Sequence, residues 1–172
     1  MIITISGLTG SGKNTLGEAI AQELNLRVVC PTFKDLAKKE GISLMEFQKK
    51  AMKDKNIDKK FDTMLKDQAK HGNCVVTTWL GAWMVKSDLR IYVFSPLELR
   101  AMRVAKRDGI SVTQAKKHII ARDNNNRKRY MKVYGIDIDG MDTFDVCLNN
   151  SKFTKQQLLD IALEIIKIKG LR

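Results

Sequence analysis

The chain has 172 residues, of which 44% are hydrophobic and 29% charged, and its formal net charge is +12. This composition is typical of a globular protein and argues against intrinsic disorder. No apolar run approaches the ~20 residues that a membrane-spanning helix needs, and the N-terminal MIITISG lacks the length and charged flank of a signal peptide. We therefore expect one cytoplasmic domain over residues 1–172, without membrane segments and acting as a monomer.

Segments typical of strands and of helices alternate along the chain. The run IITIS at 2–6 predicts a strand buried on both faces. Further strands are expected at 26–30, 73–80, 89–95 and 144–148. Helices are expected at 15–24, 33–40, 43–53, 57–71, 95–109, 111–133 and from 154 onward. The alternation predicts an α/β fold, with a parallel sheet covered by helices on both faces.

The three cysteines are far apart in the sequence and odd in number. Cys30, Cys74 and Cys147 each lie beside β-branched residues. We expect them to be reduced thiols in the core.

The stretch GLTGSGKNTL at 7–16 fits the phosphate-binding pattern G-x-x-x-x-G-K. It follows the first expected strand and opens the first expected helix, which is the context that the pattern requires. Its glycines allow backbone N–H groups to point at phosphate oxygens, and Lys13 reaches the β- and γ-phosphates. The nucleotide-binding residues expected from this loop are Gly7, Leu8, Thr9, Gly10, Ser11, Gly12, Lys13, Asn14 and Thr15.

The position after Lys13 departs from the pattern. A hydroxyl there normally helps to hold Mg²⁺, whereas Asn14 offers a larger and weaker carbonyl ligand. Thr15 follows one place later, and in this the loop resembles those of the adenylate-kinase type. We expect ATP and Mg²⁺ as cofactors, with Thr15 near the metal and Asn14 as a second candidate.

Positive charge is concentrated between Arg100 and Lys132. This segment contains eleven Lys and Arg residues and only two aspartates, which gives it a local charge of +9. Within this segment Arg103 and Arg107 stand at i and i+4, so they share one helix face. Two kinds of partner fit this charge: the polyphosphate of a small substrate, or RNA. Both remain open at this point.

Most of the chain resembles the archaeal type of cytidylate kinase, a family of P-loop nucleoside monophosphate kinases. The stretches that carry the resemblance are MIITISGLTGSGK, FKDLAKKEGISLMEF, PLELRAMRVAKRDGIS, RKRYMKVYGIDI and FDVCLNN. The resemblance implies a three-layer P-loop fold with a five-stranded parallel sheet, a monophosphate-binding region at about 30–72 and a mobile basic lid at about 103–130. The implied reaction is transfer of the ATP γ-phosphate to CMP or dCMP.

The resemblance also implies roles for individual residues. On the donor side, Lys13, Arg103, Arg107 and Arg122 would neutralise the charge of the transferring group. On the acceptor side, the expected residues are Lys34, Thr77, Trp79, Asn126 and Arg129.

The acceptor side departs from the family pattern. After the third expected strand the family reads an acid, a glycine and an arginine, whereas this chain has Thr77, Thr78 and Trp79. Lys34 stands where the family has an arginine, so it keeps the charge but loses the planar fork, and Asn126 falls near a position that is often acidic. One interpretation is a rewritten site, in which Trp79 stacks on a nucleobase. The other is a catalytically altered ATP-binding protein that associates with RNA or ribonucleoprotein through its basic lid.

Overall fold

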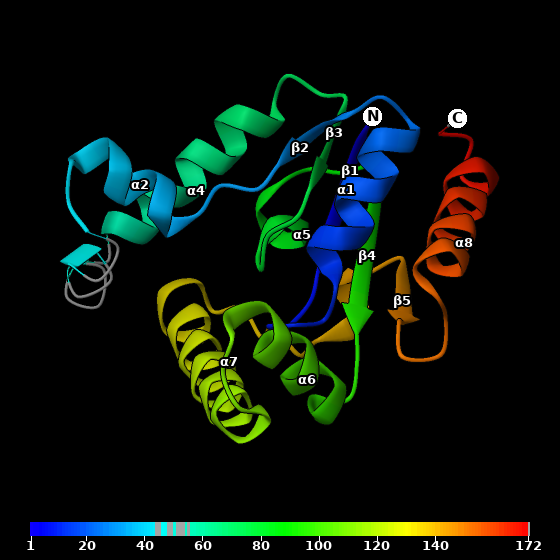
Figure 1. Ribbon diagram of the computed structural model, residues 1–172. Coiled ribbons are helices and arrows are strands. Elements are labelled where there is room, and N and C mark those ends of the chain that lie inside the picture. The colour runs from blue at the N-terminus through cyan, green and yellow to red at the C-terminus, as the bar shows by residue number, and fades with distance from the viewer. Residues whose placement is uncertain (44–45, 48–49, 51–53, 55, 172) are drawn as a thin grey trace.

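The computed structural model describes residues 1–43, 46–47, 50, 54 and 56–171, without the side chains of 33, 34 and 58. The strands are β1 (Ile2–Ser6), β2 (Arg27–Val29), β3 (Cys74–Val76), β4 (Leu89–Phe94) and β5 (Val146–Asn149). The helices are α1 (Lys13–Glu23), α2 (Phe33–Glu40), α4 (Asn56–Ala69), α5 (Gly81–Met84), α6 (Leu97–Asp108), α7 (Val112–Tyr134) and α8 (Lys155–Ile168), with a short 3₁₀ helix η1 (Met141–Thr143). Figure 1 shows this arrangement.

The five strands form one parallel sheet in the order β2-β3-β1-β4-β5. The central strand β1 pairs with β3 on one side, where Ile3 lies opposite Val75, and with β4 on the other, where Ile3 lies opposite Leu89. The chain therefore leaves β1 in one direction along the sheet and later returns to its other side. In open α/β sheets, ligands bind at the carboxyl end of the strands where the order reverses. This places the expected site after β1.

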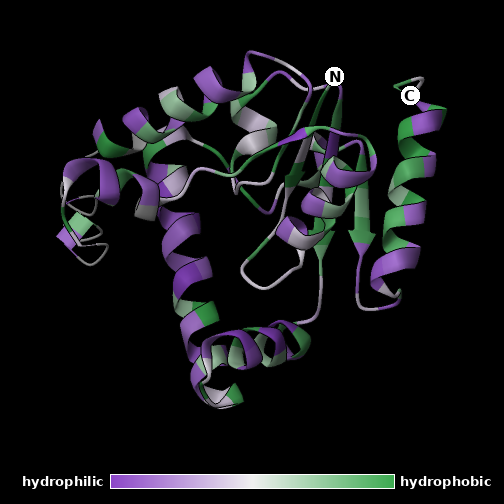
Figure 2. Ribbon diagram, turned by 45° about the horizontal axis from the view of Figure 1, so that its top comes forward, coloured by the Kyte–Doolittle hydropathy of each residue, from purple (hydrophilic) through white to green (hydrophobic). Residues whose placement is uncertain are grey.

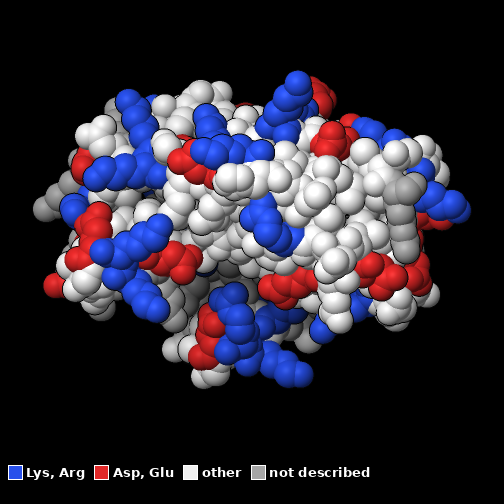
Figure 3. All heavy atoms as spheres, turned by 90° about the horizontal axis from the view of Figure 1, so that it is seen from above, with Lys and Arg blue, Asp and Glu red and all other residues white. Residues whose placement is uncertain are grey.

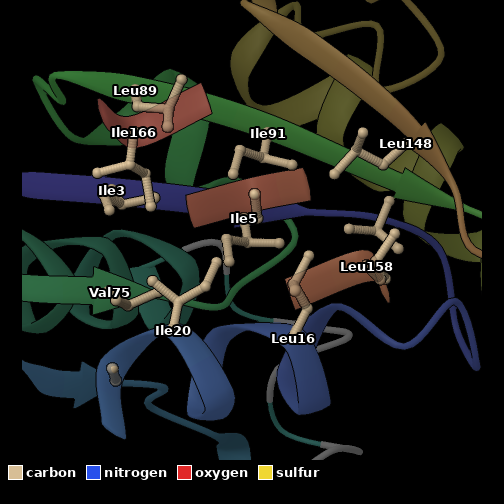
Figure 4. Close-up of a cluster of buried hydrophobic side chains, with 13 residues drawn as sticks. Ile3, Ile5, Leu16, Ile20, Val75, Leu89, Ile91, Leu148, Leu158 and Ile166 are labelled. Atoms are coloured by element: carbon tan, nitrogen blue, oxygen red, sulfur yellow. The ribbon is translucent and has the colours of Figure 1, made fainter. Parts of the chain in front are cut away.

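Both faces of the sheet are covered, as the apolar strands predict. On one face Ile3, Ile5 and Ile91 pack against α1 and α8, and Figure 4 shows these side chains interdigitating. On the other face α4 and the residues around α5 cover β2 and β3, and Leu65, Ala69 and Val85 are buried there. A third cluster lies between α6 and α7, at the carboxyl end of the sheet.

Local signals in the sequence explain where several helices begin and end. The hydroxyls of Ser111 and Thr154 cap α7 and α8 in capping boxes with Gln114 and Gln157. Gly109 ends α6 in the left-handed conformation, which glycine adopts without a steric penalty.

The predicted strands and helices within the described part of the chain are confirmed, with shifted ends. The predicted strand 73–80 is shorter than expected, because the chain leaves the sheet after Val76 and turns into α5. The sequence analysis did not predict α5 or η1, which have only four and three residues. The predicted helix 43–53 falls largely outside the described residues.

The prediction of three core thiols is wrong for Cys147, which is exposed, while Cys30 is half-buried and Cys74 is buried. Cys147 lies on β5, which pairs on one side only, with β4. The neighbouring Leu148 faces the core cluster that includes α8, so the alternation along the strand turns Cys147 outward.

No helix in the described residues is both long and apolar enough to cross a bilayer. Figure 2 shows that α7 is hydrophilic over most of its length. On the face at the top of Figure 1, lysines and arginines are interspersed with acidic residues (Figure 3).

Candidate active site

The glycine-rich loop connects β1 to α1 at the carboxyl end of the sheet. Gly10 and Gly12 adopt φ angles of +77° and +96°, which disfavour any residue with a side chain. A Cβ on Gly10 would lie 3.0 Å from the carbonyl oxygen of Arg100, and one on Gly12 would collide with the side-chain amide of Asn150. Glycine is thus required both for the turn and for the close approach of the loop to its neighbours.

Lys13 is the first residue of α1 and is half-buried. Burial and, to a smaller extent, the positive charges of Arg122 and Arg107 together lower its pKa to about 8. The fold therefore brings three predicted donor-side cations together from α1, α6 and α7. Such a cluster is electrostatically unfavourable by itself and would be stabilised by a polyphosphate anion.

Arg103 from α6 binds backbone carbonyl oxygens of the loop. Its Nη1 donates to the carbonyl oxygens of Gly10 (3.5 Å) and Ser11 (3.3 Å). The same atom lies 2.9 Å from Ser95 Oγ and 2.8 Å from Asn150 Oδ1. Asn150 in turn donates its amide to the Ser11 carbonyl. The loop is therefore clamped by residues that follow β4 and β5.

A buried ion pair lies next to this clamp. Arg100 Nη1 donates to Asp123 Oδ2 at 2.7 Å and to the Thr9 carbonyl oxygen at 3.0 Å. The Thr9 amide donates to Asp123 Oδ1 at 3.4 Å. Arg100 is 8% exposed and Asp123 is 2% exposed. Through this pair α6 and α7 hold both the backbone N–H and the backbone carbonyl of Thr9 in the loop.

Arg107 is exposed and forms a two-bond ion pair with Asp108, with Nε–Oδ1 at 2.6 Å and Nη2–Oδ2 at 2.9 Å. The bonds from Arg107 lower the pKa of Asp108, and the charges of Arg122 and His118 act in the same direction. Arg107 is thus held at the end of α6, near enough to Lys13 for its charge to act there.

The predicted acceptor-side residues come from three parts of the fold. Asn126 and Arg129 are half-buried on α7, and burial lowers the pKa of Arg129. Trp79 follows β3 and packs against Tyr130, with ring centroids 6.3 Å apart at 53°. Lys34 lies in the first turn of α2, and its side chain is outside the described part of the structure.

Thr77 is 2% exposed, and a Cβ on Gly17 would collide with its methyl group. The buried hydroxyls of Thr9, Ser11, Thr77 and Thr78 make no hydrogen bond within the described structure. Buried polar groups are nearly always satisfied in proteins. These hydroxyls at the ends of β1 and β3 therefore fit a site that is completed by a polar ligand and its waters.

A cavity of about 250 Å³ opens beside the end of β2, within the region expected to bind the monophosphate. Its lining includes Val28, Cys30, Asp35, Lys39, Met64 and Gln68. Cys30 also accepts a bond from Asn14 Nδ2 at 3.5 Å and donates to the Thr77 carbonyl oxygen at 3.4 Å. The cavity therefore adjoins the start of α1.

The residues near Lys13 fit a metal that is brought in by its substrate. Asn14 and Thr15 are exposed at the start of α1 and offer neutral oxygens. Among the described residues, no group of three or more His, Cys, Asp or Glu could hold a metal ion. Mg²⁺ commonly keeps several waters and binds through substrate phosphates and one or two protein oxygens, so this donor set suits Mg²⁺ bound to a nucleotide.

The family described as "Cytidylate kinase-like family" matches residues 2–152. The chain belongs to this family. It is 43% identical to the cytidylate kinase of Pyrococcus horikoshii over 94% of this chain and 85% of that protein. It is 39% identical to the cytidylate kinase of Methanocaldococcus jannaschii over 96% and 97% of the two chains. The resemblance found in the sequence is therefore confirmed.

Solved structures share the fold at low sequence identity. An uncharacterized protein from Eubacterium ventriosum has a TM-score of 0.73 at 15% identity, covering 97% of this chain and 98% of that one. Shikimate kinase from Acinetobacter baumannii, in complex with shikimate, has a TM-score of 0.63 at 16% identity, covering 99% and 95%. The prediction of an α/β kinase fold with a five-stranded parallel sheet is thus confirmed.

The sequence analysis missed four residues that hold the loop. Ser95, Arg100, Asp123 and Asn150 all contact the loop or its Arg103 partner. Arg100 and Asp123 were counted only as charges of the basic segment. The sequence analysis did not predict that these two residues are buried. The apolar spacing of Ala101, Val104 and Ala105 marks the buried face of α6, and it was the available signal that Arg100 lies beside that face.

Proposed function

We propose that this protein transfers the γ-phosphate of ATP to a nucleoside monophosphate, with CMP or dCMP as the acceptor, and with Mg²⁺ as cofactor. The observation that carries the proposal is the cluster of Lys13, Arg107 and Arg122 at the phosphate loop of a member of the cytidylate kinase-like family. The two relatives named above are cytidylate kinases, and the similarity to this chain extends over most of the length of each.

On the donor side, we assign the β- and γ-phosphates to the loop amides and to Lys13. Phosphoryl transfer needs little covalent chemistry from the protein, and depends on positioning and on neutralising the charge of the transferring group. Lys13, Arg103, Arg107 and Arg122 carry that charge in the proposal. Arg107 would exchange its exposed partner Asp108 for phosphate oxygens, a change that costs little because surface ion pairs are weak.

On the acceptor side, we assign the monophosphate to Lys34 and Arg129, and the nucleoside to Thr77, Trp79 and Asn126. The indole of Trp79 offers a face for stacking, worth roughly 1–3 kcal/mol per base. The packing of Trp79 against Tyr130 supports this assignment, because Tyr130 lies on α7 next to Arg129 and one turn after Asn126.

When bound, Mg²⁺ would neutralise part of the charge of the ATP phosphates. Thr15 and Asn14 would hold it from the protein side. The contact from Asn14 Nδ2 to Cys30 leaves the carbonyl oxygen of the Asn14 amide as the group available to the metal.

The alternative of an RNA-associated protein without kinase activity is not favoured, because the similarity to cytidylate kinases extends over nearly the whole chain. The single domain, the monomeric state and the cytoplasmic location remain predictions from the sequence.

A panel of acceptors tests the proposal. Purified protein is incubated with ATP, Mg²⁺ and each of CMP, dCMP, UMP, AMP and GMP, with the Lys13→Met variant as the control for contaminating kinases. We expect CDP and dCDP to form fastest, and only with the unsubstituted protein. Equal diphosphate formation by the Lys13→Met variant, or none with any acceptor, would refute the proposed activity.

A further inference from the structure

Four side chains on α7 contact four other parts of the protein, and they follow one line along the helix. They are Asp123, Arg127, Tyr130 and Tyr134, with spacings of four, three and four residues. At 3.6 residues per turn, this spacing keeps all four on one face. We call these residues the anchor stripe.

Each anchor contact is made to a different element. Asp123 binds Arg100 and the Thr9 amide in the phosphate loop. Arg127 forms a two-bond ion pair with Asp139 in the turn after α7, at 2.6 and 3.1 Å. Tyr130 packs on Trp79 after β3. The stripe therefore ties the helix to the P-loop side and to the β3 side of the site.

The last anchor reaches the region expected to bind the acceptor. The Tyr134 hydroxyl donates a hydrogen bond to Oδ2 of Asp62 on α4. Asp62 is only 7% exposed, and its burial raises its pKa. A buried carboxylate that lost this donor would be left under-satisfied, which makes the contact energetically costly to break.

The residues proposed to act on the nucleotides lie one position before the anchors. Arg122, Asn126 and Arg129 share a second line, about 100° around the helix from the anchor stripe. The contacts of the anchor stripe fix the orientation of α7 about its own axis. This orientation determines the direction in which the second line faces. The charge of Arg122 acts on Lys13, which is consistent with this line facing the loop.

We propose that Asp123 and Tyr134 are positioning residues, which lock the rotation of the C-terminal half of α7 and so aim Arg122 and Arg129 at the two nucleotides. This inference rests on the proposed function for the roles of those arginines. It also shortens the lid that the sequence predicts at 103–130. Residues from Asp123 onward are held by the P-loop and α4, so closure is confined to the part of the lid before Asp123.

Two variants distinguish a positioning role of Tyr134 and Asp123 from a general contribution to the stability of the fold. Tyr134→Phe removes one hydroxyl and keeps the ring. The control is Thr63→Val on α4, which removes an exposed hydroxyl that donates to the Lys59 carbonyl oxygen of its own helix. Asp123→Asn keeps the size of the side chain and removes the charge that faces Arg100.

Backbone hydrogen exchange is measured first, because it does not depend on activity. In the unsubstituted protein, we expect the amides of 123–134 to exchange much more slowly than those of 112–120. Tyr134→Phe should accelerate exchange in 126–134 by about tenfold, from the loss of one part-buried hydrogen bond to a buried carboxylate. Thr63→Val should leave the exchange of this segment unchanged. Equal exchange in Tyr134→Phe and the unsubstituted protein would overturn the inference.

Steady-state kinetics then test whether Tyr134 and Asp123 position Arg129 and Arg122. Tyr134→Phe should raise the KM for the acceptor about tenfold with kcat changed less than about threefold, because its effect is exerted at the Arg129 end. Asp123→Asn should instead lower kcat by at least about tenfold, since it loosens both the loop and Arg122. Combining Asp62→Asn with Tyr134→Phe should add little to either single change, because the two side chains act through one bond.

The two proposals fail in different ways. An unsubstituted protein without kinase activity would contradict the proposed function, and the exchange measurement would still decide whether the anchors hold α7. An active protein whose KM and kcat are unaffected by Tyr134→Phe and Asp123→Asn would overturn the positioning roles while leaving the proposed function intact.

Discussion

At the scale of single residues, Lys13 has the most strongly perturbed surroundings of the residues in the phosphate loop. It is half-buried beside two arginines, and these surroundings lower its pKa from 10.5 to about 8. The free protein therefore keeps a cation in a place that disfavours it. Binding sites commonly carry such a cost in stability for the sake of function.

We expect the Lys13→Met variant to be more stable than the unsubstituted protein at pH 7. The unfolded chain binds this proton more tightly than the folded one, so the charge costs about 1–3 kcal/mol below pH 8 and progressively less as the pH rises toward 10.5. Urea unfolding at pH 7 measures the difference, with the exposed Lys86→Met as control. A lower midpoint for Lys13→Met than for Lys86→Met would contradict this account.

The affinity for ATP should fall as the pH rises above 8. A polyphosphate next to Lys13 raises its pKa, so binding takes up a proton when the free lysine is neutral, and the Kd should rise by up to about tenfold between pH 8 and pH 9. Calorimetry in buffers of different ionisation enthalpy measures the proton uptake. Lys13→Arg keeps its charge in this range and should show neither effect. Proton uptake of the same size in Lys13→Arg would assign it to another group.

At the scale of elements, the contacts that hold the loop were the least predictable part of the site. The spacing of the loop glycines and the placing of Arg103 and Arg107 one turn apart on a helix are local patterns, and the sequence was sufficient for both. The catalytic roles of the two arginines remain predictions. Asn150 contacts Ser11 across 139 positions of sequence, and no local pattern carries that pairing. It follows from the parallel sheet, which brings the ends of β1, β4 and β5 together.

Gly12→Ala tests the close packing between the loop and the end of β5. An added Cβ there would meet Asn150 in a backbone conformation that disfavours alanine. Gly41→Ala is a matched control, because Gly41 has a φ of +68° but nothing lies within 4 Å of its Cβ. We expect Gly41→Ala to cost about 1 kcal/mol in unfolding free energy, and Gly12→Ala to cost more and to abolish ATP binding. Equal costs for the two variants would show that the loop is not packed as described.

At the scale of the whole molecule, the sheet order places the loop where the chain changes direction, and α6 and α7 close over this end. The fold class followed from the alternation of apolar strands and amphipathic helices. The arrangement of α7 did not, because its anchors Asp123, Arg127 and Tyr134 look like surface residues in a basic helix. Only the tertiary contacts distinguish the anchor stripe from the line of residues that we propose to face the nucleotides.

Removal of metal should leave the folded protein intact. The described residues offer no group of acidic, His or Cys side chains for a metal ion, so Mg²⁺ should bind only together with a nucleotide. We expect EDTA, or millimolar Mg²⁺ alone, to leave the Tm unchanged, and Mg²⁺ with ATP to raise it by linkage. A rise in Tm with Mg²⁺ alone would reveal a metal site of the protein itself.

The most direct measurement follows the phosphorus atom. The purified protein is given ATP labelled in the γ-phosphate together with CMP and Mg²⁺, and the labelled products are separated. The account predicts that the label appears in CDP, and that Lys13→Met abolishes its appearance. Label released only as inorganic phosphate, or retained in ATP that is bound but not consumed, would contradict phosphoryl transfer and leave a nucleotide-binding protein.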